Sequence, residues 1–255
     1  MSHLEPSWHE AREIAHACVD RLPTEPVRLR DAHGITAAEE VRALTPLPPT
    51  DISAMDGWAV AGDGPWVVIG QVLAGAVWAT PLAVGQAVQI ATGTSLPRGC
   101  DGVLRSEDGL LDGSGVVRGR VRAGGDFRRK GEEARAGEIL IPAGRVMTPA
   151  RIGLAAASGH DTVAVRRRPI VRLLVLGDEI LAEGPARDGR VRDSLGPQLP
   201  GWLSRLGVDL VETVHVEDTL PAQSTALSSA AEAADFVVTT GGTAAGPADH
   251  LRAAI

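Results

Sequence analysis

Apolar runs alternate with helical patterns in the last third of the chain, and this alternation most constrains its fold. The segment PIVRLLVLG, from residue 169, is a nearly continuous apolar run, as expected for a strand covered on both faces. Two more strand-like runs, VDLVETVHV and DFVVTTGG, follow, each after a segment with helical spacing. This order predicts a parallel sheet with right-handed crossovers. Three strands are few for such a sheet, so we expect an incomplete α/β domain over residues 169–255.

Residues 50–137 have a different texture, in which short β-like runs alternate with glycine turns. Runs such as GWAVAG, PWVVIGQVLAG, QAVQIATG and DGVLRSEDG predict a small β-rich module. Before it, residues 7–22 follow helical spacing, and Ser7 and Glu10 fit a capping box. After it, we expect short strands over 139–142 and 145–147 and then a helix of small residues that ends before Gly159. The fold class is therefore multi-domain, α/β plus β.

Charge and composition argue against several classes of function. The net charge is −7, which offers no electrostatic footprint for nucleic acid. The N-terminus lacks the features of a signal peptide, and no run approaches the roughly 20 apolar residues of a membrane span. We therefore expect a cytoplasmic protein that does not bind membranes. The two cysteines lie far apart and the seven histidines are scattered, which disfavours a cysteine- or histidine-based metal site.

Carboxylates and glycines gather where the three predicted parallel strands end. The first strand ends in Gly177, Asp178 and Glu179, and the second ends near Asp218. The third runs into Gly241 and Gly242, before a helix that carries Asp249 in its first turn. Ligands bind at this edge of open parallel sheets, and Mg²⁺ can bridge carboxylates to phosphate oxygens. This pattern predicts a phosphate and magnesium site, although Asp178 and Asp218 would also suit helix caps or loops.

Two polar loops of the β-rich module form a second candidate group. LPPTDISAMDGWAV places Asp51, Ser53 and Asp56 in a short loop before an apolar strand, where either a functional loop or a well-capped turn fits. GGDFRRKGEEARAG combines the basic residues 128–130 with Glu132 and Glu133. That segment could clamp an anion, bridge subunits or be an ordinary solvated loop.

Taken together, several segments resemble the molybdopterin molybdenumtransferase family, which includes the gephyrin E domain. The matching segments, in the family's order, are LPPTDISAMDGWAV, IATGTSLPRGCDGVLRSED, GGDFRRKGEEARAGEILIPAGRVMTPARIGLAAASG, RRRPIVRLLVLGDEI, VRDS and VVTTGGTAAGPAD. The resemblance implies an elongated linking and dimerisation domain (1–49 and 138–168), the β-rich module (50–137) and a partial molybdopterin-binding α/β domain (169–255).

The resemblance also implies a reaction and a site. Such enzymes insert molybdate into adenylylated molybdopterin and release AMP, with Mg²⁺ assisting, as homodimers whose active site joins the β-rich part of one subunit to the α/β domain of the other. Carried over by motif, the implied catalytic residues are Asp56, Glu133, Glu179 and Asp218. The implied metal ligands are Asp218 and Asp249. The implied substrate-binding residues are Thr92, Arg128, Glu132, Gly177, Asp178, Ser194, Gly241 and Gly242.

Departures from the family pattern leave two main interpretations open. Glu133 replaces the usual aspartate, Val175 and Leu176 replace Ser-Thr, and Leu195 replaces the asparagine of D-S-N. The family also continues well beyond residue 255. The first interpretation is a molybdenum insertase, complete or completed by a separate chain. The second is a non-catalytic molybdopterin-binding or scaffold protein, and a weaker third is a degraded gene product. We expect weaker molybdopterin binding and slow or absent turnover.

Overall fold

The computed structural model describes residues 6–122, 124–242 and 250–255. The chain divides into two compact units. The first comprises Met1–Pro26, Gly34–Ala38 and Ala164–Ile255, and the second comprises Val27–His33 and Glu39–Val163. Among the described residues, no helix is long and apolar enough to span a membrane.

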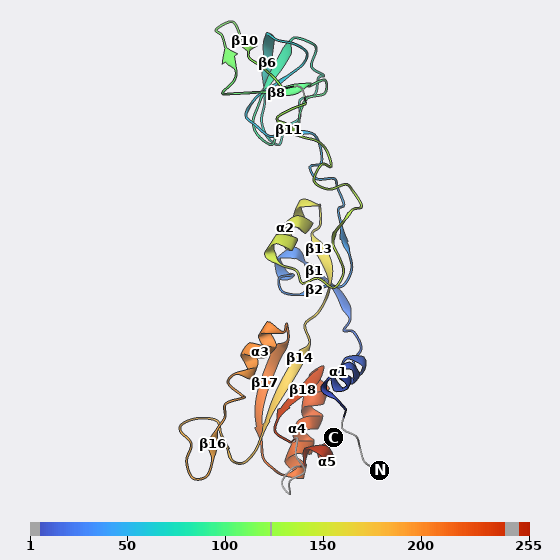
Figure 1. Cartoon of the computed structure of the whole chain (residues 1–255), viewed down its shortest axis with the longest axis vertical. Coiled ribbons are helices and arrows are strands. Elements are labelled where there is room, and N and C mark those ends of the chain that lie inside the picture. The colour runs from blue at the N-terminus through green and yellow to red at the C-terminus, as the bar shows by residue number, and fades with distance from the viewer. Residues whose placement is uncertain (1–5, 123, 243–249) are drawn as a thin grey trace. The chain divides into compact units, whose positions relative to one another are not determined.

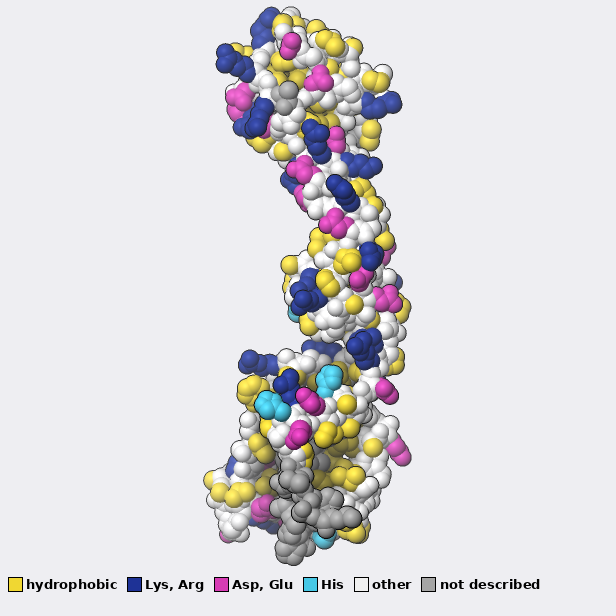
Figure 2. Space-filling model, turned by 45° about the vertical axis from the view of Figure 1, so that its right-hand side comes forward, with side chains coloured by type: hydrophobic (Ala, Val, Ile, Leu, Met, Phe, Trp, Pro, Cys, Tyr) yellow, Lys and Arg dark blue, Asp and Glu magenta, His cyan; other side chains and the backbone are white. Residues whose placement is uncertain are grey.

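The second unit is built around the β-rich module that the sequence predicts (Figure 1). Its main sheet has six strands in the order β8-β5-β7-β6-β10-β9. Two hydrophobic clusters line it, one around Val88 and Val103 and one around Trp58 and Leu104. Basic and acidic side chains are interspersed over the face of this module seen in Figure 2. The strands are β5 (Gly57–Val60), β6 (Trp66–Val72), β7 (Gln86–Ile90), β8 (Gly102–Arg105), β9 (Leu110–Leu111) and β10 (Val116–Arg118).

Shorter elements complete the second unit. A pair of two-residue strands, β4 (Ile52–Ser53) and β11 (Phe127–Arg128), joins the two polar loops of the module. Another pair, β3 (Val41–Arg42) and β12 (Ile139–Ile141), precedes helix α2 (Pro149–Ala157), which Thr148 caps. A 3-10 helix, η1 (Leu29–Asp31), contacts α2. Residues 145–147 do not form the expected second strand, because the Gly144 turn and the α2 cap leave too little chain for a ladder.

The first unit contains the expected parallel sheet. Its strand order is β17-β14-β18, with β14 (Ile170–Leu176) paired in parallel to both β17 (Asp209–Val216) and β18 (Phe236–Thr240). Helices α3 (Leu199–Arg205), α4 (Leu220–Ala233) and α5 (Leu251–Ala254) connect or follow these strands. Leu174, Leu176 and Val216 pack against α4 and Leu251 in one cluster. The apolar run of β14 is thus the central strand of the sheet, and the parallel pairing is the one that the sequence predicts.

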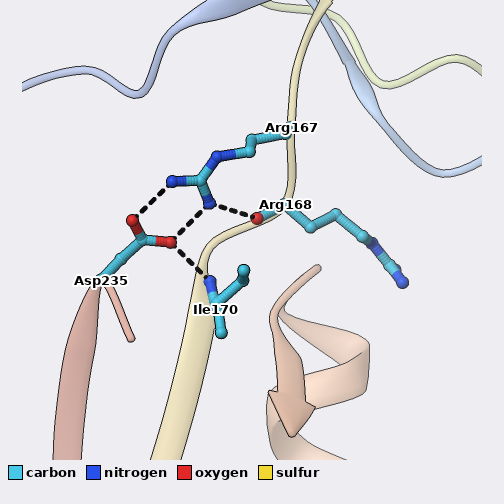
Figure 3. Close-up of polar contacts among 4 residues, drawn as sticks. All are labelled: Arg167, Arg168, Ile170 and Asp235. Carbon is cyan, nitrogen blue, oxygen red and sulfur yellow. Dashed lines mark hydrogen bonds and ion pairs between the residues drawn. The ribbon is translucent and has the colours of Figure 1, made fainter. Parts of the chain in front are cut away.

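Ion pairs connect the amino-terminal ends of the three parallel strands. The carboxylate of Asp235, which directly precedes β18, binds the Arg167 guanidinium through two hydrogen bonds of 2.5 and 2.6 Å. It also accepts a hydrogen bond of 2.7 Å from the backbone N–H of Ile170, the first residue of β14 (Figure 3). Arg168 lies 3.2 Å from Asp209, the first residue of β17. These two arginines therefore connect the start of the central strand to both of its neighbours.

The remaining elements of the first unit are short. Helix α1 (Trp8–Ala17) begins with the predicted capping box of Ser7 and Glu10. It ends before the expected residue 22, because no side chain of α1 is buried and packing does not extend the helix toward Pro23. Strands β2 (Thr36–Ala37) and β13 (Thr162–Arg166) pair antiparallel, and β1 (Thr24–Arg28) lies on the other edge of β13. Strands β15 (Ile180–Leu181) and β16 (Val191–Arg192) form a small parallel pair.

Candidate functional site

Asp56 directly precedes strand β5 and is held by the Thr92 loop. Its Oδ1 accepts hydrogen bonds of 2.6 Å from the Thr92 backbone N–H and 2.8 Å from the Thr92 hydroxyl. The backbone hydrogen bond, followed by the hydroxyl, lowers the pKa of the Asp56 carboxyl. Because both contacts stabilise the charged form, Asp56 is an oriented, exposed carboxylate at neutral pH.

Close packing of the backbone creates this arrangement. Gly57 has φ +148°, and a Cβ there would lie 2.0 Å from the Leu104 carbonyl oxygen, so position 57 requires glycine. Ser53 is buried and its hydroxyl donates to the Met55 carbonyl at 2.6 Å. The Ser53 backbone also exchanges hydrogen bonds with Gly93 and Thr94. The loop before β5 and the loop after β7 are therefore joined on both sides of Asp56.

The basic-acidic loop after β11 joins the same region. The Arg128 guanidinium lies 2.8 Å from the Glu133 carboxylate, with both side chains about half exposed. Glu132 instead accepts a hydrogen bond of 2.8 Å from the Arg129 backbone N–H and so closes a turn. The Lys130 backbone N–H donates to Asp51 at 2.7 Å, which connects this loop to the loop that carries Asp56. Of the five predicted site residues of the second unit, Arg128 ends β11 and the other four lie in loops, and hydrogen bonds connect these segments.

In the first unit, the G-D-E turn after β14 shows why glycine comes first. Gly177 has φ +132°, and a Cβ there would lie 2.7 Å from a carboxylate oxygen of Glu179. The Asp178 backbone N–H donates to the Asp218 carboxylate at 3.1 Å, and the Asp218 N–H donates to Asp178 at 3.3 Å. These reciprocal bonds hold the loops after β14 and β17 side by side, as a shared ligand edge requires.

Asp218 does not cap helix α4, so the helix-cap interpretation of this residue is wrong. Thr219 is the cap, and its hydroxyl accepts from the Ala222 N–H. The second Asp218 oxygen instead lies 3.3 Å from the amide nitrogen of Gln223, a side chain only 2% exposed. Among the residues that the structure describes, the buried Gln223 oxygen has no hydrogen-bond partner. Asp218 therefore does not cap α4, but its carboxylate accepts a hydrogen bond from the Gln223 side chain of that helix.

The loop that carries Ser194 depends on its neighbour. Asp193 is 8% exposed, and its Oδ1 accepts from the backbone N–H groups of Leu195 and Gly196 at 3.0 and 2.8 Å. The other oxygen lies 3.4 Å from His215 Nε2 at the end of β17. Ser194 itself is exposed beside this fixed carboxylate. Asp193, His215 and Gln223 were absent from the predicted site residues, because no sequence motif marks the hydrogen bonds and the ion pair that they make in the fold.

The glycine loop after β18 is described only as far as residue 242. Gly241 and Gly242 have φ of +94° and +73°, and a Cβ on Gly242 would lie 2.5 Å from Leu251. The predicted metal ligand Asp249 lies outside the described residues. Among the residues that are described, no three His, Cys, Asp or Glu side chains form a group that could hold a metal ion. In the described part of this edge, Asp178 and Asp218 are two acids whose loops are hydrogen-bonded to each other.

Fold and loops together define a class: a protein with a β-rich N-terminal part and a parallel α/β domain whose strand ends carry acids and glycines. Two family matches agree with this class. The MoeA N-terminal region (domain I and II) matches residues 6–159, and the probable molybdopterin binding domain matches residues 172–255. The chain belongs to the MoeA family.

Individual relatives are moderately similar. The chain is 28% identical to the molybdopterin molybdenumtransferase of Staphylococcus aureus (strain Mu50) over 90% of this chain and 58% of that protein. It is 30% identical to the Bacillus subtilis (strain 168) protein of the same name, over 90% of this chain and 57% of that one. A crystal structure of a molybdopterin biosynthesis MoeA protein from Pyrococcus horikosii matches with a TM-score of 0.81 and 26% identity, covering 96% of this chain and 65% of that one. The chain thus spans less than two thirds of these relatives.

Proposed function

We propose that this protein binds a molybdopterin-type ligand and acts in molybdenum cofactor biosynthesis. The proposed step is insertion of molybdate into adenylylated molybdopterin with release of AMP. The observation that carries the proposal is the strand-end edge of the α/β domain, where the Asp178 and Asp218 loops bind each other and a two-glycine loop follows β18. Such an edge suits a phosphate-bearing ligand. The Staphylococcus and Bacillus relatives are named molybdopterin molybdenumtransferases, which supports a role in molybdenum cofactor biosynthesis.

The side chains suggest separate roles. Asp218, with Asp178, would hold Mg²⁺, since that ion commonly takes one or two carboxylates together with substrate phosphates and water. Bound Mg²⁺ would neutralise phosphate charge. In the β-rich module, the ionised Asp56 would accept a proton or position a polar group of the ligand. Arg128 would bind an anionic group of the ligand in place of the Glu133 carboxylate that it now contacts. Glu133 and Glu179 are exposed carboxylates available for acid–base work.

The proposal includes assembly and cellular location. We propose a homodimer, because α1 leaves Trp8 and Ile14 69% and 55% exposed and buries none of its side chains. A separate chain that supplies further strands remains part of the proposal, as does a cytoplasmic location. Sedimentation of the purified chain tests the dimer, and a clean monomer at micromolar concentration would count against it.

A direct assay tests the reaction. Purified protein is mixed with adenylylated molybdopterin, molybdate and Mg²⁺, and released AMP is measured. We expect AMP release that requires Mg²⁺ and falls at least about tenfold in Asp56→Ala. His160→Gln is the matched control, because His160 contacts the Arg42 carbonyl and no predicted site residue. AMP release that is unchanged in Asp56→Ala would remove this residue from the mechanism.

Two buried side chains favour a second candidate, a molybdopterin-binding protein without turnover. Val175 and Leu176 stand where the family usually has hydroxyl residues, and they are only 1% and 6% exposed. Leu176 packs in the core with Leu174 and Val216. These positions therefore offer a ligand no side-chain hydrogen bonds, each worth about 0.5–1.5 kcal/mol. Tight molybdopterin binding without AMP release would support this candidate over the insertase.

A further inference from the structure

His215 lies at the carboxyl end of β17, where it pairs in register with Val175 of the central strand. Its ring nitrogen Nε2 is 3.4 Å from a carboxylate oxygen of Asp193. Asp193 immediately precedes Ser194, and His215 comes three residues before Asp218. The pair therefore adjoins two of the loops that the proposed function uses.

The Asp193 carboxylate is a fixed and largely dry partner. Its side chain is 6% exposed, and two backbone N–H groups, those of Leu195 and Gly196, bind its other oxygen. A Cβ on Gly196 would lie 2.1 Å from Asp193 Oδ2, so the chain leaves room for the carboxylate there. Buried carboxylates need compensating partners, and the ring of His215 is the partner that faces Oδ2. The Asp193 carboxylate and the His215 ring therefore face each other at 3.4 Å.

The opposite side of the ring is open. The His215 side chain is 43% exposed, and within the ranges that the structure describes its Nδ1 makes no hydrogen bond. A histidine whose Nε2 faces a carboxylate presents Nδ1 outward, and in its charged form that nitrogen is an N–H donor. Such a donor suits an anionic oxygen, because hydrogen bonds between charged groups are the stronger ones.

We propose that His215, positioned by Asp193, is a further ligand-binding residue that donates from Nδ1 to a phosphate oxygen of the pterin ligand. The identity of the ligand rests on the proposed function. The phosphate chemistry does not, since inorganic pyrophosphate offers the same oxygens. In this arrangement Asp193 is a positioning residue and does not contact the ligand.

Substitutions can separate the two nitrogens of the ring. His215→Gln keeps an amide nitrogen close to the position of Nε2, and so keeps a donor for Asp193, but removes Nδ1. We expect about a tenfold loss of molybdopterin affinity in equilibrium dialysis, with the unfolding midpoint unchanged. Asp193→Asn, which frees the ring to rotate, should give a similar loss. His160→Gln serves as the matched control, because the Nε2 of His160 likewise lies against an oxygen atom, the backbone carbonyl oxygen of Arg42, and this variant should bind as the wild type does.

A second probe keeps this proposal separate from the proposed function. Inorganic pyrophosphate is titrated into the full chain while the histidine ring signals are followed by nuclear magnetic resonance, with His215 assigned by its loss in His215→Gln. We expect pyrophosphate to shift the His215 signal in wild type and to shift it less in Asp193→Asn. If His215 shifts but molybdopterin does not bind, the proposed function fails and the phosphate contact stands. Equal molybdopterin affinity in wild type and His215→Gln, or an unmoved His215 signal, overturns the inference.

Discussion

Removing the Asp235 carboxylate should weaken the α/β domain in a pH-dependent way. Asp235→Asn takes away the charge that binds Arg167 through two hydrogen bonds and weakens the bond to the Ile170 N–H. Arg167, as the first cause, lowers the pKa of Asp235 from 3.8 to about 2, and the Ile170 N–H adds to the shift. The carboxylate therefore stabilises the folded state in its ionised form.

The size of the effect follows from linkage. A lowering from 3.8 to about 2 corresponds to about 2.4 kcal/mol at about 1.36 kcal/mol for each pH unit. The Asp235 and Arg167 side chains are 22% and 33% exposed, and solvent screening reduces this to about 1–2 kcal/mol. Because the folded pKa is the lower one, the stabilisation is complete above about pH 4 and is lost as the pH falls toward about 2.

Urea unfolding of the full chain, followed by far-ultraviolet circular dichroism, measures this effect. We expect Asp235→Asn to be about 1–2 kcal/mol less stable than wild type at neutral pH, with about half of that difference remaining near pH 3. Arg167→Met serves as a partner variant that keeps the Ile170 contact and should lose less. If the free energies of unfolding of wild type and Asp235→Asn differ by the same amount at neutral pH and near pH 2, the ionised carboxylate is not the source of the stabilisation.

Three other substitutions, one of them with a comparison variant, test particular contacts. Gly57→Ala places a Cβ 2.0 Å from a backbone oxygen at φ +148°, and should destabilise by more than about 3 kcal/mol. Gly75→Ala, at φ +87° with no atom within 4 Å, should cost only about 1 kcal/mol in the same urea titration. Gln223→Leu removes an oxygen that is buried without a partner among the described residues, together with the 3.3 Å hydrogen bond to Asp218, so thermal unfolding should show stability within about 1 kcal/mol of wild type or above it, whereas a larger loss would contradict this expectation. Ser7→Ala removes the cap of a helix without buried side chains, so hydrogen exchange of the α1 amides should accelerate while global stability stays constant; a lowered global stability would show that α1 packs more than the structure indicates.

Local sequence patterns predicted those elements that depend mainly on neighbouring residues. The apolar run of β14 predicted a parallel strand covered on both faces, and Ser7 with Glu10 predicted the start of α1. The end of α1 was misplaced, because periodicity continues to residue 22 while packing does not. The strand order of the β-rich module, in which β6 lies between β7 and β10, depends on distant pairings that no local pattern encodes.

The candidate site likewise has features that the sequence predicts and features that it does not. Glycines and acids at strand ends could be found from the chain, since parallel strands bring their carboxyl ends to one edge. The contacts that orient them could not, because Asp178 and Asp218 are 40 positions apart and Asp56 and Thr92 are 36 apart. The motif carried over from the family pointed to Ser194, whereas the buried group in that loop is Asp193.

Whether the strand-end edge of the α/β domain binds a molybdopterin-type ligand can be measured on the full chain. Equilibrium dialysis with increasing molybdopterin, in the presence of Mg²⁺, measures the number of ligands bound to each chain. We expect saturable binding of one ligand per chain, weakened in Asp218→Ala and unaffected in His160→Gln. Folded protein that shows no saturable binding, or binding that Asp218→Ala leaves unchanged, would contradict it.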